Sequence, residues 1–314
     1  MITPTTEPTT GHDLTTTRAP FIEDSIDRGE LFIEQPYALY SDDNQEAWQR
    51  LYRRMVPRWQ RYAHPRFLEG VDSLALNDRR VPRLDDINQF LEPLSAFKAK
   101  AVAGYVPAFL FFDCLRRREF PTTITIRDKN TLDYLPEPDI FHDIAGHVPM
   151  HTDRQFSDVL VRFGEVARAA AARALEIPER AERVKVVESN IKAMARFFWF
   201  TVEFGLMRRP DDAPGETDLC VYGSGLLSSF GEIEHCIVSP KVQRFPFRLE
   251  WVVNQYFEID KYQPLLFVVD SFGHLFDQVA LLEDWLQAGR LDNVSPGEPL
   301  INEADLRSFL NASL

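Results

Sequence analysis

Two histidines that stand five positions apart place the strongest constraint on this chain. The segment 136–153 reads PEPDIFHDIAGHVPMHTD and contains His142 and His147. On a straight α-helix, residues five apart are rotated by roughly 140°, so the two imidazoles would face different sides. They can bind one metal ion only if the helix between them is interrupted. Gly146 favours a left-handed helix end and Pro149 cannot continue a helix, so the sequence predicts a break there.

The composition and the charge exclude several classes of protein. A chain of 314 residues, 45% of them apolar, is typical of a globular protein with a substantial core. The net charge of −13 argues against a general affinity for nucleic acid or an anionic membrane. No apolar run approaches the roughly 18 residues of a membrane span, and no secretory signal is recognisable. The sparse cysteines, which lack disulfide-like spacing, predict a reducing, cytoplasmic location; they are Cys114, Cys220 and Cys236.

The pattern along the chain predicts a single, mainly α domain of packed helices with a few short strands. Residues 1–30 are rich in Thr and Pro, which predicts a disordered tail, either natural or a tag. Helical periodicity is found near 44–55, 85–102, 107–118, 153–176, 181–207, 226–236 and 274–288, and strand-like runs at 122–127 and 265–269. We therefore expect a catalytic domain over 31–290. A short C-terminal extension, 291–314, would carry one candidate helix at 303–312.

A single acid in an apolar helix is the candidate third metal ligand. Residues 196–206 are apolar nearly all round, which indicates a buried helix, and Glu203 is the only acid among them. A buried carboxylate needs a partner. That partner is either Arg196, about two turns earlier, or a metal ion shared with His142 and His147. Two imidazoles and one carboxylate leave three positions open on one face, an arrangement suited to non-haem Fe(II) and oxygen chemistry.

The other histidines give weaker signals. His151 follows His147 by four positions, but Pro149 between them argues against a shared helix turn, so we expect a surface histidine. Structural or solvent roles are expected for the remaining histidines, which are His12, His64, His235 and His274.

Three long motifs in order resemble those of the pterin-dependent aromatic amino acid hydroxylases. They are PEPDIFHDIAGHVP at 136–149, WFTVEFGL at 199–206 and YGSGLLSSFGE at 222–232. Shorter stretches at 35–52, 111–127 and 262–272 follow in the same order, so the likeness spans about 35–285. Tyr134, Leu135 and Asp143 make it greatest to the bacterial phenylalanine 4-hydroxylase branch. The resemblance implies the catalytic-domain fold of this family.

The resemblance also implies roles for the metal-site and carboxylate-binding residues. His142, His147 and Glu203 fall on the iron ligands of the family. Arg127 falls on the arginine that holds the substrate carboxylate as a bidentate pair, a geometry that lysine does not match. Asp139 falls on the acid that positions this arginine. By itself, Arg127 would be read as a surface charge at a strand end.

The implied substrate pocket has five further members. Trp199 and Pro138 fall on its walls, Gly225 lies in a turn that lets the backbone approach the substrate, and Leu135 replaces a threonine of the animal enzymes. Ile259 falls where tyrosine hydroxylases carry an acid, which disfavours tyrosine. Trp199 is the choice typical of enzymes acting on phenylalanine. Without the resemblance, Trp199 would be read as ordinary core packing.

Four residues are implied in supporting the metal and in binding the pterin. Ser228 falls on a serine that orients the first iron histidine by a hydrogen bond. Phe111 falls on the ring that stacks on the pterin, with Val106 nearby. Asp143 replaces a glutamate that contacts the pterin in animal enzymes.

The implied activity is hydroxylation of L-phenylalanine to L-tyrosine, with Fe(II), tetrahydrobiopterin or a related tetrahydropterin, and O₂. The same chemistry on L-tryptophan, or at the meta position of phenylalanine, is the alternative. A zinc hydrolase using the same three ligands, with Asp143 as general base, is an alternative of another class. A non-catalytic protein that binds an aromatic metabolite is a third. Because the regulatory domain and tetramerising helix of the family have no counterpart here, we expect a monomer or weak dimer.

Overall fold

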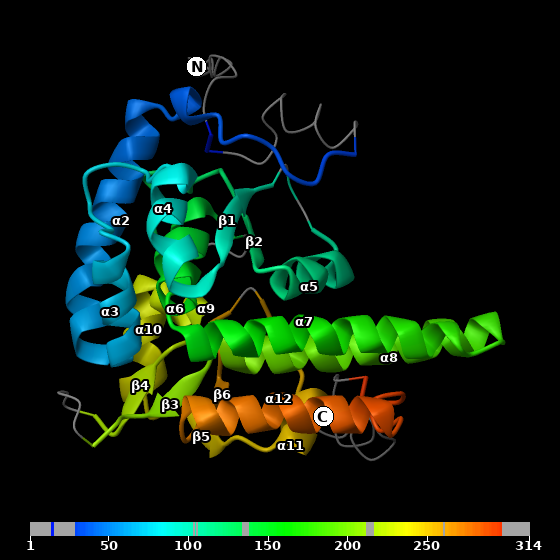
Figure 1. Cartoon of the computed structure of the whole chain (residues 1–314). Coiled ribbons are helices and arrows are strands. Elements are labelled where there is room, and N and C mark those ends of the chain that lie inside the picture. The colour runs from blue at the N-terminus through cyan, green and yellow to red at the C-terminus, as the bar shows by residue number, and fades with distance from the viewer. Residues whose placement is uncertain are drawn as a thin grey trace, which may run out of the picture.

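The computed structural model describes residues 14–15, 29–102, 104, 106–133, 138–211, 217–259 and 261–296. Within these ranges the protein is mainly helical with two small sheets, which confirms the predicted fold class (Figure 1). The predictions for Leu135 and for a helix at 303–312 lie outside the described residues.

The elements follow in a fixed order. The helices are η1 (Tyr37–Leu39), α2 (Asp42–Tyr62), α3 (Pro65–Ser73), α4 (Leu84–Ser95), α5 (Ala108–Arg116), η2 (Phe141–His147), α6 (Val148–His151), α7 (Arg154–Leu175), α8 (Arg180–Phe198), η3 (Trp199–Glu203), α9 (Ser224–Leu227), α10 (Phe230–Val238), α11 (Leu249–Asn254) and α12 (Phe272–Gln287). The strands are β1 (Lys98–Ala101), β2 (Glu119–Thr122), β3 (Leu206–Arg208), β4 (Leu219–Val221), β5 (Gln243–Pro246) and β6 (Leu265–Val269).

Two long helices, α7 and α8, lie side by side and form the central layer (Figure 1). Helix α12 packs along α7 on one side, and α5 packs against α7 on the other. Helices α2 and α3 stand at one end of this layer, where α3 contacts α6 and α2 contacts α10. The short helices η2, α6 and α9 are therefore enclosed where these layers meet.

The two sheets differ in part from the sequence prediction. Strands β1 and β2 pair in parallel, and a second sheet has the order β4-β3-β6-β5, with only the β3–β4 pair antiparallel. The strand predicted at 265–269 is β6. The predicted strand 122–127 is wrong, because the pairing ends at Thr122. The predicted helix 85–102 is too long: Ala96 has a left-handed φ of 62°, which ends α4 and allows strand β1 to begin.

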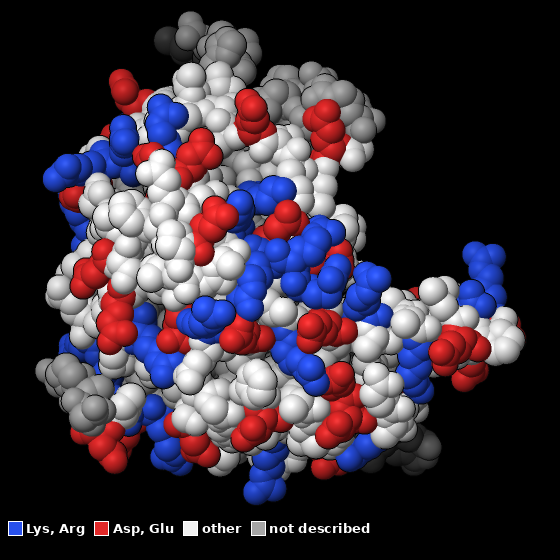
Figure 2. All heavy atoms as spheres, viewed as in Figure 1, with Lys and Arg blue, Asp and Glu red and all other residues white. Residues whose placement is uncertain are grey.

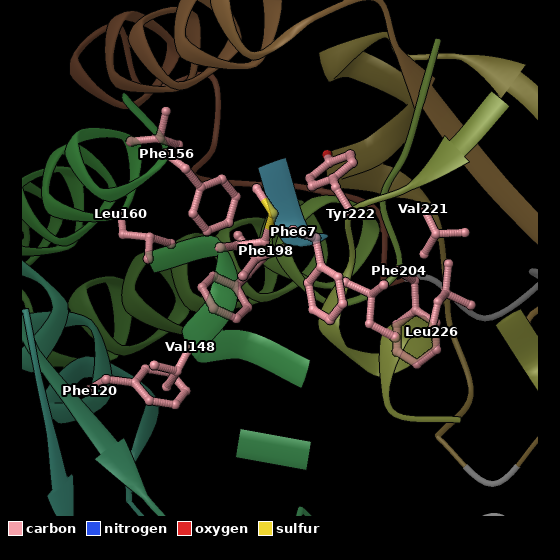
Figure 3. Close-up of a cluster of buried hydrophobic side chains, with 14 of the residues drawn as sticks. Phe67, Phe120, Val148, Phe156, Leu160, Phe198, Phe204, Val221, Tyr222 and Leu226 are labelled. Atoms are coloured by element: carbon pink, nitrogen blue, oxygen red, sulfur yellow. The ribbon is translucent and has the colours of Figure 1, made fainter. Parts of the chain in front are cut away.

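A cluster of buried rings and aliphatic side chains fixes the segments around the candidate site (Figure 3). Its labelled members come from helices, strands and the loops between them, and are Phe67, Phe120, Val148, Phe156, Leu160, Phe198, Phe204, Val221, Tyr222 and Leu226. Burying a side chain of this size stabilises the fold by about 1.5–3 kcal/mol. The cluster thereby anchors α6 and α8, the helices directly joined to η2 and η3.

Both ends of the described chain pack more closely than the sequence suggests. Leu14 lies in the segment expected to be disordered, yet its side chain is fully buried, and its carbonyl accepts the Ile126 N–H at 2.9 Å. Leu291, in the predicted extension, is also fully buried, and Asp292 pairs with Arg173. These residues belong to the packed domain, because backbone bonds and burial hold them there.

The surface carries both signs of charge. On the face shown in Figure 2, basic and acidic side chains are interspersed and form no field of one sign. Among the described residues, Arg117 forms ion pairs with Asp113 and Glu119. None of the helices described above combines the length and the apolar character that crossing a bilayer requires.

Candidate metal centre

The two histidines lie on a π-helix, η2, and this explains their spacing. In a π-helix each turn is closed by a bond between residues five apart, so His142 and His147 come to the same side. Their Nε2 atoms are 3.2 Å apart. The predicted break is wrong: Gly146 lies inside η2, and Pro149 occupies the first turn of α6, where no N–H is needed. The helix is widened instead of being interrupted.

Gly146 serves a different purpose from the one expected. A Cβ atom at this position would lie 2.9 Å from the carbonyl oxygen of Ser224, closer than real side chains approach. The missing side chain therefore lets α9 pack directly on η2, and α9 carries polar groups that face the histidines.

Glu203 completes a cluster of three potential ligands. It ends η3, a second π-helical segment that follows α8. Its Oε1 lies 3.1 Å from Nε2 of His147 and its Oε2 lies 3.5 Å from Nε2 of His142. Adjacent ligands about 2.1 Å from an octahedral ion are about 3 Å apart, so the three groups fit around one ion.

The alternative partner for Glu203 is not used. The guanidinium of Arg196 donates instead to three backbone carbonyls, those of Val253, Ser295 and Pro296. The structure therefore contradicts the ion pair, and the metal site stays the prediction for Glu203.

The protonation states of His142 and Glu203 are those that favour binding of a cation. Burial lowers the pKa of His142 to about 4, so its ring is neutral and keeps a free lone pair at neutral pH. Burial alone would raise the pKa of Glu203, but His147, His142 and the Ser224 hydroxyl bring it to about 2. A neutral imidazole and an ionised carboxylate are the forms that bind a metal ion.

Two serines, one at the start of α9 and one directly after its end, contact the proposed metal ligands. Ser228 Oγ lies 2.9 Å from Nδ1 of His142, in the position that the sequence predicted. Ser224 was not predicted as a site residue. Its Oγ lies 2.9 Å from Nε2 of His147 and 2.9 Å from Oε2 of Glu203. Its position four residues before Ser228, one helical turn away, was the only available signal.

Arg127 and Asp139 form a buried ion pair beside the cluster. Asp139 accepts from Nε of Arg127 at 2.8 Å and from Nη2 at 3.0 Å, and it also accepts the backbone N–H of His142. Burial works against both charges, but their mutual attraction raises the pKa of Arg127 and lowers that of Asp139. The guanidinium borders the cavity, but its Nη1 also donates to the carbonyl oxygens of Leu132 at 3.4 Å and Asp133 at 3.2 Å. An anionic group in the cavity would therefore compete with these two carbonyls for the N–H groups of Arg127.

A cavity of about 330 Å³ opens onto the three ligands. Most of the predicted site residues line it: His142, His147, Glu203, Arg127, Pro138, Trp199, Gly225, Ser228, Val106, Phe111 and Asp143. Asp139 lies behind Arg127. Ile259 is 52% exposed and is not among the residues that line the cavity, so its predicted place in the substrate pocket stays a prediction.

Asp143 sits at the cavity wall with a backbone partner. Its Oδ2 accepts the Thr123 N–H at 2.6 Å. Burial raises the pKa of this carboxyl to about 7, with His147 and Thr123 opposing the shift.

Trp199 is held in place by residues that the sequence did not indicate. Its indole N–H donates to Oε1 of Gln263 at 3.1 Å, and its ring stacks on Phe257 with centroids 4.2 Å apart. The backbone N–H of Gln263 in turn donates to Glu232 at 2.7 Å. These contacts join segments far apart in the chain, which local patterns do not reveal.

Replacing Glu232 by Gln is expected to stabilise the protein above pH 7. Burial raises the pKa of Glu232 to about 7, with the Gln263 N–H only partly opposing it. Between pH 4.5 and 7 the folded state therefore keeps a proton that the unfolded state has released, and stability falls as the pH rises. Because glutamine does not titrate, the variant should gain on the order of 2–3 kcal/mol at pH 8 relative to pH 4. Urea unfolding at both pH values measures this, and an unchanged pH dependence would contradict it.

His151 differs from its predicted surface position, since it is fully buried. Because η2 continues directly into α6, His151 points into the core. Its ring packs there against Phe97, Phe120 and Phe156. Neither ring nitrogen has a hydrogen-bond partner among the residues that the structure describes. Burial holds the pKa of His151 well below its ordinary value, so the ring is neutral.

The change His151→Leu is expected to raise stability. It removes two buried polar atoms without partners and keeps an apolar side chain in an aromatic environment, which predicts a gain of about 1–3 kcal/mol. Thermal and urea unfolding of the metal-free protein measure the change. His151→Gln is the matched control, because it keeps a buried polar group and should bring no gain. Destabilisation by leucine would show that the imidazole has a partner.

Comparisons with known proteins give matches over most of the chain. The sequence profile of the family described as biopterin-dependent aromatic amino acid hydroxylase matches residues 32–287. The phenylalanine-4-hydroxylase of Chromobacterium violaceum is 35% identical over 256 residues, which are 82% of this chain and 79% of the relative. A crystal structure of the phenylalanine hydroxylase from that organism, with iron(III) and 7,8-dihydrobiopterin bound, is 33% identical with a TM-score of 0.71, covering 86% of this chain and 90% of the other. A structure bound to cobalt gives a TM-score of 0.72 at 33% identity and the same coverage.

Proposed function

The chain belongs to the family of biopterin-dependent aromatic amino acid hydroxylases, and from this premise we propose that it converts free L-phenylalanine to L-tyrosine with iron, a tetrahydropterin and O₂. The family resemblance inferred from the motifs is thereby confirmed. The observation that carries the proposal is the cluster of His142, His147 and Glu203 at the wall of a cavity that Arg127 and Trp199 also line. The catalytic domain in this proposal spans 31–290.

The proposed metal ligands are His142, His147 and Glu203. The donor set of two imidazoles and one carboxylate, with ligand atoms within 4.8 Å of one another, is suited to iron(II) with one open face. Iron, reduced pterin and O₂ together supply the oxidant that inserts one oxygen atom into the aromatic ring. Ser228 fixes the orientation of His142 through Nδ1, so that Nε2 faces the ion.

The remaining residues orient the substrate in this proposal. The amino acid carboxylate binds the Nη edge of Arg127 in competition with the Leu132 and Asp133 carbonyls, and Asp139 prevents the guanidinium from rotating. Trp199 and Pro138 form the walls for the ring, and Gly225 leaves room beside them. Apolar walls exclude water from the reacting carbon.

The proposed pterin site uses other residues of the cavity lining. Phe111 offers an aromatic ring for a flat heterocycle, with Val106 beside it. Asp143, whose Oδ2 is already engaged by the Thr123 N–H, offers its other oxygen to the donor groups of the pterin. Support for a pterin comes from the dihydrobiopterin bound in the relative.

The test is anaerobic reconstitution with Fe(II), followed by tetrahydropterin, O₂ and each aromatic amino acid in turn. We expect pterin-dependent oxygen uptake and tyrosine from phenylalanine, identified by mass and NMR. Hydroxylated tryptophan or meta-tyrosine as the main product would replace the proposed substrate or regiochemistry. Tight zinc binding with no oxygen uptake would support the hydrolase alternative and overturn the proposal.

We further propose a monomer or weak dimer in the cytoplasm. All three cysteines are free and buried, which is compatible with a reducing compartment. Light scattering over a range of protein concentrations tests the oligomeric state, and a stable tetramer would contradict it.

A further inference from the structure

One hydroxyl group beside the three proposed metal ligands has no assigned role. Ser224 begins α9, and its side chain is 99% buried, with only 1% of the residue exposed. Its Oγ lies 2.9 Å from Nε2 of His147, 2.9 Å from Oε2 of Glu203 and 3.2 Å from the carbonyl oxygen of Val202. The hydroxyl therefore faces two of the three ligands from the side of α9.

The position of this hydroxyl is fixed by the packing of α9. The carbonyl oxygen of Ser224 accepts the N–H of Ser228 at 2.9 Å, and that carbonyl lies against Gly146 of η2. The other end of the helix is held by Trp59, whose indole N–H donates to the Leu227 carbonyl at 2.7 Å. Ser224 and Ser228, one turn apart, thus place one hydroxyl beside His147 and Glu203 and the other beside His142.

A bound metal ion decides which partner the Ser224 hydroxyl keeps. Once Nε2 of His147 binds the ion, its lone pair can no longer accept a hydrogen bond. The hydroxyl hydrogen is then left with Oε2 of Glu203 or the Val202 carbonyl. The carboxylate oxygen is both closer and charged, and charge-assisted hydrogen bonds are roughly twice as strong as neutral ones.

We propose that Ser224 is a positioning residue that engages Oε2 of Glu203, so that Glu203 binds the metal through Oε1 alone. Oε1 lies 3.1 Å from Nε2 of His147, whereas Oε2 is farther from its neighbouring ligand, 3.5 Å from Nε2 of His142, and is the oxygen that the hydroxyl reaches. A carboxylate bound through both oxygens would occupy one more coordination position. Ser224 thereby preserves the open face of the site. This inference rests on the proposed function and deepens it.

The experiment uses Co(II) as the probe, added anaerobically to the full-length, metal-free protein. Binding is followed by visible absorption, which reports the coordination of the ion as well as its affinity. The variants are Ser224→Ala and, as the matched control, Thr201→Val. Thr201 is a fully buried residue of η3 that donates to the Phe197 carbonyl of α8 and is not among the residues that line the cavity. Circular dichroism of both metal-free variants establishes that they are folded.

We expect Ser224→Ala to weaken Co(II) binding about tenfold, equivalent to about 1.4 kcal/mol, and to change the visible spectrum. Thr201→Val should keep the wild-type affinity and spectrum. An alanine variant with wild-type affinity and spectrum would overturn the inference, as would equal changes in both variants. If the wild-type protein itself binds no Co(II), the proposed metal site fails, and this outcome is distinct from a failure of the Ser224 inference alone.

Discussion

Replacement of Glu203 by Gln is expected to abolish iron binding and ring hydroxylation while the fold is retained. The carboxylate is ionised at neutral pH, with a pKa of about 2, and supplies the only negative charge among the three proposed ligands. The neutral amide is a poorer ligand for a cation, and one of its two polar atoms is a donor. Loss of an outer partner of a metal ligand costs 10–100-fold in affinity. Loss of the ligand itself should therefore exceed about 100-fold.

The measurement combines metal content after Fe(II) reconstitution, tyrosine formation with tetrahydropterin and O₂, and circular dichroism. Glu232→Gln is the control for metal content, because it makes the same change at a buried glutamate that lies outside the lining of the cavity. A Glu203→Gln protein with stoichiometric iron and full activity would refute the metal assignment. A variant that has lost its helical signal would instead assign Glu203 a structural role.

The sequence predicts which residues form the cluster of two histidines and one glutamate better than it predicts their geometry. His142, His147 and Glu203 could be found because a lone acid in an apolar helix and two close histidines are unusual locally. The form of the helix could not be found, because a π-helix differs from an α-helix only in which backbone groups pair. Gly146 was therefore interpreted as a helix end, although it permits the close approach of α9.

The residues that support the cavity were missed for a different reason. Gln263 and Phe257 meet Trp199 across more than fifty positions of sequence, so no local periodicity connects them. His151 was misplaced because Pro149 was expected to end a helix, whereas proline is tolerated in the first turn of α6. The mainly helical class could be predicted, because it depends on apolar periodicity within each segment. The order β4-β3-β6-β5 depends on long-range pairing and could not.

The change Asp139→Ala is expected to destabilise the protein by about 3–5 kcal/mol and to raise the KM for phenylalanine. The exposed fractions of the two side chains are 5% for Arg127 and 2% for Asp139, so removing the acid leaves an uncompensated buried charge. The same carboxylate accepts the backbone N–H groups of Arg127 and His142, and both would lose their partner. The proposed carboxylate-binding group and the start of η2 would therefore loosen together.

The double variant Asp139→Ala with Arg127→Met separates the two effects. Removing both charges takes away the uncompensated cation, so urea unfolding should show that part of the lost stability returns. Hydroxylation should not return, because the guanidinium proposed to bind the substrate carboxylate is gone. If the double variant were as unstable as Asp139→Ala alone, the backbone bonds of Asp139, and not the charge pair, would be its main contribution. If the double variant kept the wild-type KM, Arg127 would not bind the carboxylate, and the proposed orientation of phenylalanine in the cavity would be wrong.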